Sequence, residues 1–186
     1  MTETRLRFDK GMAKTVITLL LFAAVVAFLL GLVNHITADR IADYRAEKTL
    51  AAMKAVLPSS EYSQLVYEGD PTVAAVFRAG DQGWIFEVTP SGFGGLIDML
   101  VGVDTGGKVT GVSIISMSET SGLGANAARE SFRSQYVGKS GSVKLKKQGG
   151  EIDALTGATV TSTAVTKGVD TALGIAVELM KGGTLS

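Results

Sequence analysis

Four hydroxyl side chains fall within seven residues in a segment that reads Asp-Ala-Leu-Thr-Gly-Ala-Thr-Val-Thr-Ser over residues 153–162. A long apolar pattern typical of a helix follows. The first N–H groups of a helix have no partner within the helix, and the helix dipole favours an anion there. A phosphate would fit this place, because Gly157 and Ala158 allow close backbone approach and Thr159 presents a hydroxyl. An ordinary Ser/Thr-rich helix cap would have the same composition.

This segment resembles the flavinylation motif of the FMN-binding subunits in Rnf-type electron transport complexes and sodium-translocating NADH:quinone reductases. In those families the last Thr of a Ser/Thr-Gly-Ala-Thr core is esterified by the phosphate of FMN. The resemblance therefore implies covalent FMN, held by a phosphoester to Thr159. It also implies that a separate Mg-dependent flavin transferase installs the FMN and reads a modification signal beginning at Asp153. The residues expected around the phosphate are Thr156, Gly157, Ala158, Thr161 and Ser162.

Two further blocks carry the same resemblance. Residues 118–124, Ser-Glu-Thr-Ser-Gly-Leu-Gly, are similar to a Glu-Thr-Pro-Gly-Leu-Gly loop of the family, with Ser121 in place of the usual Pro. Residues 92–97 and 100–104 are similar to the glycine-rich turn and strand that precede that loop. Relative to the family pattern, Ser121 removes a fixed φ from the loop. The short chain favours the G subunit of an Rnf-type complex over the C subunit of the quinone reductase.

The loop and the turn supply the remaining expected cofactor-binding residues. We expect Leu123 and Ile97 to contact the isoalloxazine, while Glu119 and Thr120 shape the loop beside it. A solvated or capping carboxylate is the alternative role for Glu119. The other two cofactor-binding positions expected from the resemblance are Gly122 and Gly124.

Composition excludes several kinds of function. The chain has 18 Lys plus Arg and 18 Asp plus Glu, which gives no electrostatic case for nucleic acid. It has no cysteine, so it carries neither a disulfide nor a thiolate-ligated iron–sulfur cluster. With a single histidine as well, a typical zinc or blue-copper site is excluded, and no metal site is expected. No acid–base constellation is visible, so we expect no catalytic residue and no catalysis by this chain alone.

A membrane segment is expected near the N-terminus. Residues 15–38 contain no Asp, Glu, Lys or Arg, and in a helix they would extend about 36 Å against a hydrocarbon core of about 30 Å. A cleaved signal peptide is the competing interpretation, although its apolar region is normally shorter. Basic residues flank the span on both sides. The positive-inside rule alone therefore gives a weak signal. Together with the resemblance, which supplies most of the argument, it places the N-terminus in the cytoplasm and the large domain outside the cell membrane.

The expected organisation is a cytoplasmic tail (1–14), a transmembrane helix (15–38), a helical stalk (39–57) and one FMN-binding domain (58–186). Short β-rich runs at 65–67, 73–78, 84–89, 96–103 and 109–117, separated by turn residues, predict a mainly antiparallel sheet. Helical patterns at 125–135 and 159–180 predict flanking helices, and 143–147 is predicted as a further strand. The fold class is therefore α+β.

Three classes of function remain open. The first, which the resemblance implies, is a membrane-anchored electron carrier in an Rnf-type complex that couples ferredoxin and NAD redox chemistry to ion movement. Its partners would be the other membrane and redox subunits, a flavin transferase during maturation, and membrane lipid. The second is an anchored extracytoplasmic flavoprotein that serves another acceptor. The third is a non-redox binding or structural domain.

Overall fold

The structure, a computed structural model, describes residues 10–182. Helix α1 (Lys10–Val56) is continuous, and the chain divides into two compact units, Met1–Glu47 and Lys48–Ser186. In the first unit, Gly11–Ala38 is a 28-residue helical stretch that is long and apolar enough to cross a membrane. It contains the whole of the predicted span. Residues 1–9 of the predicted cytoplasmic tail lie outside the described residues.

The three threonine hydroxyls within this apolar stretch are hydrogen-bonded to the helix backbone. The Thr15 hydroxyl donates to the Gly11 carbonyl at 3.2 Å, and the Thr18 hydroxyl donates to the Lys14 carbonyl at 2.8 Å. Thr37 makes the same i−4 bond at 2.8 Å. Such bonds remove the cost of leaving hydroxyl groups without partners in lipid.

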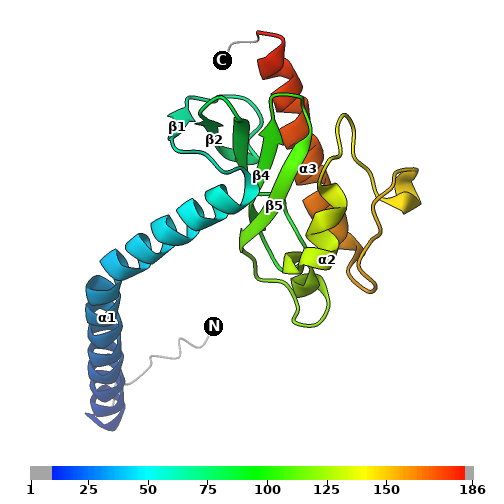
Figure 1. Cartoon of the computed structure of the whole chain (residues 1–186). Helices are drawn as coiled ribbons and strands as arrows, with labels where there is room; N and C mark the ends of the chain where they lie inside the picture. Colours follow the sequence, from blue (N-terminus) through cyan, green and yellow to red (C-terminus); the bar gives the residue numbers. More distant parts are fainter. Residues whose placement is uncertain (1–9, 183–186) are drawn as a thin grey trace, which may run out of the picture. The chain divides into compact units, whose positions relative to one another are not determined.

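The second unit is built on one five-stranded antiparallel sheet whose spatial order follows the chain, from β1 to β5 (Figure 1). A hairpin joins the last two strands, and the Asp104 carboxylate closes it by accepting the N–H groups of Gly106 and Lys108, both at 2.9 Å. The predicted α+β class is confirmed. The strands are β1 (Tyr62–Leu65), β2 (Val73–Ala79), β3 (Gly83–Val88), β4 (Asp98–Asp104) and β5 (Val109–Ser116).

One face of the sheet packs against helix α3 (Thr159–Met180), which has the bounds that the sequence predicts. Side chains from alternate strand positions meet the apolar face of α3, and this burial supplies the main core. Because α3 is fixed along its length by this core, its N-terminal turn has a defined position. Core residues at this interface include Phe86, Met99, Val101, Val165, Val169 and Leu173.

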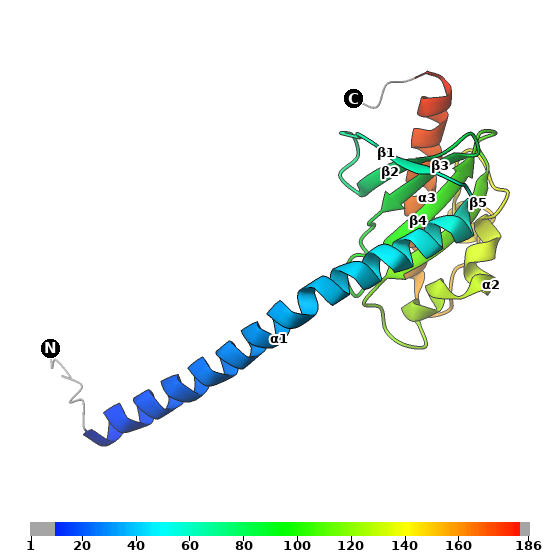
Figure 2. The same ribbon diagram turned by 60° about the vertical axis from the view of Figure 1, so that its left-hand side comes forward.

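The opposite face of the sheet packs against the last turns of α1 (Figures 1 and 2). Gly102 and Gly111 are cross-strand partners beneath Val56. A Cβ on Gly111 would lie 2.9 Å from the Val56 Cα, and a Cβ on Gly102 would lie 2.8 Å from the Val56 carbonyl oxygen. The two glycines therefore allow the helix backbone to lie directly on the sheet. The side chains of this second cluster are Met53, Val56, Leu57, Ala79, Ile85, Leu100 and Ile115.

The connection between β5 and α3 differs from the sequence prediction in two places. The predicted helix 125–135 is a series of short turns, η1 (Gly124–Ala128), α2 (Glu130–Arg133) and η2 (Ser134–Tyr136). The predicted strand 143–147 is wrong. Val143 and Leu145 are buried as the alternation implies, but the backbone forms one isolated bridge, between Leu145 and Ile152, and then the turn η3 (Lys146–Gln148).

Candidate functional site

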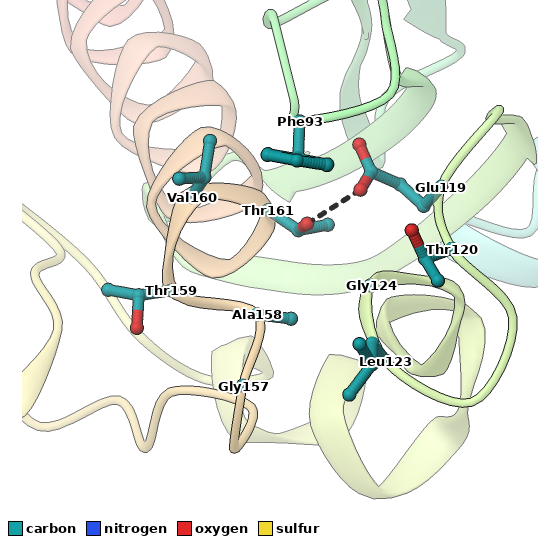
Figure 3. Close-up of a pocket in the computed structure, with 10 residues that line it drawn as sticks. All are labelled: Phe93, Glu119, Thr120, Leu123, Gly124, Gly157, Ala158, Thr159, Val160 and Thr161. Atoms are coloured by element: carbon teal, nitrogen blue, oxygen red, sulfur yellow. Dashed lines mark hydrogen bonds between the residues drawn. The ribbon is translucent and has the colours of Figure 1, made fainter.

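Three segments that are far apart in the sequence meet at one pocket of about 400 Å³, shown in Figure 3. They are the turn between β3 and β4, the loop after β5, and the start of α3. The volume is within the range of about 300–1,000 Å³ typical of small-molecule sites. The residues that line the pocket are Phe93, Glu119, Thr120, Leu123, Gly124, Gly157, Ala158, Thr159, Val160 and Thr161.

The first turn of α3 has no side-chain cap. The residue in the N-cap position is Ala158, and the first bond of the helix runs from the Ser162 N–H to the Ala158 carbonyl at 3.0 Å. Just before it, Gly157 has φ +74°, which is a left-handed conformation that suits glycine. The self-capped helix considered above is therefore not what the chain forms. Uncapped N–H groups at a helix start that borders a pocket are suited to an anion.

Burial separates the four hydroxyls of the segment into two kinds. The Ser162 hydroxyl is fully buried, donates to the Ala158 carbonyl at 2.8 Å and accepts the Leu155 N–H at 2.9 Å. The Thr161 hydroxyl is also buried and donates to Glu119 at 2.8 Å. Both hydroxyls are therefore committed to holding the protein together.

The other two hydroxyls are exposed. Thr159 lines the pocket, whereas Thr156 does not. In Figure 3 the Thr159 side chain lies at the edge of the labelled group, on the first residue of α3. Among the described residues, its hydroxyl has no hydrogen-bond partner. Thr159 is thus the hydroxyl residue of the segment that is both exposed and part of the pocket lining.

Glu119 connects the three segments of the site. Its Oε2 accepts the Thr161 hydroxyl at 2.8 Å, and its Oε1 accepts the Gly94 N–H at 3.1 Å. A Cβ on Gly124 would lie 2.5 Å from Oε2, so only a glycine fits there without a shift. The carboxylate therefore holds the Gly92–Gly95 turn and the first turn of α3 onto the loop after β5.

Three exposed apolar side chains surround the pocket opening. Phe93 is 74% exposed, Val160 53% and Leu123 44%. Exposed apolar groups that converge on a pocket are typical of a site for an apolar ligand surface. Sequence reasoning did not select Phe93 or Val160, although an aromatic residue inside a glycine-rich turn and a lone Val between threonines were available signals.

The structure places four of the expected cofactor-binding residues outside the pocket lining. Ile97 is fully buried in the core and lies beneath the turn, where a Cβ on Gly92 would be 2.8 Å from its Cδ1. Gly122, at φ +79°, shapes the loop, and its carbonyl accepts the Asn126 side-chain amide at 2.7 Å. Thr156 and Ser162 belong to the same group, as described above.

The loop with the Ser121 departure is closed by its own hydrogen bonds. The Thr120 carbonyl accepts the N–H groups of Leu123 at 3.2 Å and Ala125 at 3.1 Å. The Asn126 amide adds a third bond by reaching back to Gly122. These bonds restrain the loop without the fixed φ of a proline.

Asp153, the expected modification signal, lies outside the pocket lining and is exposed. Its carboxylate pairs with Lys146 at 2.7 Å, and its backbone N–H donates to the Gln135 side-chain oxygen at 2.8 Å. Lys146 and Gln135 thus hold the beginning of the segment that leads to Thr159.

The apolar walls of the pocket are suited to a flat apolar ring system, and the uncapped helix start beside them is suited to a phosphate. One ligand that contains both groups would fit the site. The fold and the site therefore define an α+β domain with a pocket suited to a phosphorylated aromatic cofactor. Residues 92–174 match the FMN-binding domain family, and residues 1–56 match the RnfG N-terminal region family. The chain belongs to the RnfG family, the G subunits of Rnf-type ion-translocating oxidoreductase complexes.

Several curated proteins are similar to the chain. The G subunit of the sodium-translocating ferredoxin:NAD⁺ oxidoreductase complex of Acetobacterium woodii is 30% identical, over 97% of this chain and 99% of that protein. The G subunit of the ion-translocating oxidoreductase complex of Methanosarcina acetivorans is 31% identical, over 89% and 94%. The G subunit of the proton-translocating ferredoxin:NAD⁺ oxidoreductase complex of Clostridium ljungdahlii is 44% identical, with 57% of this chain matching about half (55%) of that protein.

Proposed function

We propose that this chain is the membrane-anchored electron-transfer subunit of an Rnf-type complex and carries FMN as a phosphoester on Thr159. The assignment of Thr159 rests on one observation, the different surroundings of the four hydroxyl residues in the segment. Ser162 and Thr161 are buried and hydrogen-bonded, Thr156 does not line the pocket, and Thr159 is exposed and lines the pocket. The FMN-binding domain match and the uncapped start of α3 support the same assignment.

Different groups of the site would contact different parts of the cofactor. The N–H groups in the first turn of α3 would take the phosphate, and Phe93, Leu123 and Val160 would contact the isoalloxazine. The bound flavin supplies the electron-transfer chemistry, while the chain supplies attachment, orientation and electrostatic environment. Attachment requires a flavin transferase. In that reaction the Thr159 oxygen bonds to the phosphorus of an activated flavin phosphate, the bond to the donor's leaving group breaks, and the hydroxyl proton is released.

The proposed organisation retains a cytoplasmic tail (1–14), a membrane span (15–38), a stalk (39–57) and an extracytoplasmic FMN domain (58–186) in the cell membrane. A tether would keep FMN on the protein where free cofactor is scarce. The other proposed partners are the membrane and redox subunits of the complex. Co-purification with several polytopic membrane proteins would separate this proposal from an anchored flavoprotein that serves another acceptor.

The test of the covalent site is intact mass of the purified full chain from a host with an active flavin transferase. The wild-type protein should carry one FMN adduct, and Thr159→Ala should carry none. Thr163→Ala is the matched control, because it removes a hydroxyl of the same helix that lies just beyond the motif and does not line the pocket. It should keep the adduct. An adduct on Thr159→Ala would overturn the assignment, and an unmodified wild-type chain would overturn the covalent proposal.

A further inference from the structure

The Glu119 carboxylate lines the pocket and, among the residues that the structure describes, forms no ion pair. Both of its oxygens act as acceptors, one from the Gly94 N–H and one from the Thr161 hydroxyl, as an ionised carboxylate does. Within residues 10–182 the ion pairs link Lys139 with Glu151 and Lys146 with Asp153, and neither involves Glu119. Among the described residues, no Lys or Arg lines the pocket and none forms an ion pair with Glu119.

The position of this charge is fixed by close packing. A Cβ on Gly92 would lie 2.2 Å from Oε1, and a Cβ on Gly124 would lie 2.5 Å from Oε2. Glycines at these two positions let the backbone pass directly against the carboxylate, and its two hydrogen bonds restrain its rotation. A fixed charge interacts more strongly with its surroundings than a mobile, hydrated one, especially beside apolar walls such as Phe93 and Leu123.

We propose that Glu119 is a tuning residue that lowers the reduction potential of the flavin in this pocket. This inference rests on the proposed FMN site. Reduction brings two electrons from an external reductant, with protons from solvent, into the ring system. A fixed carboxylate beside the pocket opposes that added negative charge, so it favours the oxidised form.

The charge of Glu119 can be separated from its bridging role. In Glu119→Gln the amide oxygen can accept the Gly94 N–H, and the amide NH₂ can donate to the Thr161 oxygen once that hydroxyl rotates and gives up its role as donor. This variant removes the charge and keeps both bonds. Glu119→Ala removes the charge and both bonds together. A comparison of the two variants therefore distinguishes electrostatic tuning from a purely structural contribution.

The decisive measurement is a potentiometric titration of the purified full chain, with dithionite as reductant and flavin absorbance as the signal. Glu119→Gln should shift the reduction equilibrium about tenfold towards the reduced form, which raises the midpoint potential by about 30 mV for a two-electron couple. Glu178→Gln is the matched control, since it removes one exposed carboxylate about 26 Å along α3 from Thr161, the residue that bonds Glu119. It should titrate as the wild type does. Equal potentials for wild type and Glu119→Gln, or an equal rise in the control, would overturn the inference.

Two further readouts separate this inference from the proposed function. If the wild-type chain carries no FMN, the proposed function fails, and the inference fails with it. If wild type carries FMN but Glu119→Gln does not, the carboxylate is needed for assembly of the site and the tuning role is wrong. Hydrogen exchange of the 92–97 segment, measured without flavin, checks the bridge directly. Exchange should stay at the wild-type rate in Glu119→Gln and rise in Glu119→Ala, and a rise in both would remove the premise.

Discussion

Ser162→Ala should destabilise the domain by loosening the segment that leads to the pocket. The Ser162 hydroxyl is fully buried and ties together two backbone groups of the preceding turn, the Leu155 N–H and the Ala158 carbonyl. Alanine keeps the helix but leaves the Leu155 N–H without its acceptor. The change therefore acts on the loop before α3 rather than on the helix itself.

The expected cost follows from those two bonds. The bond that the Leu155 N–H makes is partly buried, and leaving a buried N–H without a partner costs about 1–3 kcal/mol. Alanine has a higher helix propensity than serine, and this difference offsets roughly 0.5 kcal/mol of the cost. The net loss is about 0.5–2.5 kcal/mol. At about 4 °C per kcal/mol for a domain of roughly 100–150 residues, this corresponds to a fall in Tm of about 2–10 °C.

The assay is thermal unfolding of the full chain, purified from a host without flavin transferase so that the flavin does not contribute. Trp84, the single Trp of the chain, is buried in the sheet core and reports unfolding by its fluorescence. Ser131→Ala on α2 is the matched control, because Ser131 is exposed. A Tm for Ser162→Ala within about 1 °C of this control would refute the structural role given to the Ser162 hydroxyl.

Two other expectations concern pH and membrane topology. Burial raises the pKa of the Tyr136 phenol to about 12 from an ordinary 10.0, so its stabilising effect is complete below pH 10 and is lost as pH rises through 12. Relative to Tyr136→Phe, wild type should lose about 2 kcal/mol by about pH 11.5 in urea unfolding, whereas parallel pH profiles would contradict this. Because the chain has no cysteine, Ser142→Cys and Lys14→Cys each introduce a unique label. In right-side-out vesicles an impermeant maleimide should label the former and not the latter, and the reverse pattern would contradict the proposed orientation.

Sequence patterns predicted the main elements because burial leaves a pattern along them. The apolar face of α3 reflects its contact with the sheet, so its periodicity is visible without the fold. The strands do not alternate in burial: β3 and β4 are buried on both faces and are visible instead as short apolar runs bounded by turn residues. The wrong strand at 143–147 shows the limit of this reasoning. Val143 and Leu145 do alternate with exposed lysines, but alternation reveals only which side chains are buried. It does not reveal whether a neighbouring strand is present to pair with the backbone.

The site was less accessible to sequence reasoning, because its contacts join distant segments. Glu119 and Thr161 are 42 positions apart, and nothing local indicates that one accepts a hydrogen bond from the other. The same holds for the turn at 92–97. Its apolar residues look equivalent in the sequence, yet Ile97 is buried and Phe93 faces the pocket. Only the packing of the turn on the core decides which of them a ligand can meet.

The N-cap of α3 shows how a local sequence choice and the fold act together. Ser, Thr, Asp and Asn stabilise an N-cap by about 1 kcal/mol relative to alanine, and this segment contains three threonines and a serine, yet Ala158 occupies that position. A hydroxyl at residue 158 would bond the first N–H groups of α3 and compete with a phosphate for them. With alanine there, the nearby hydroxyls are free for other tasks. Ser162 closes the preceding turn, Thr161 binds Glu119, and the Thr159 hydroxyl stays exposed beside donors that the helix itself cannot satisfy.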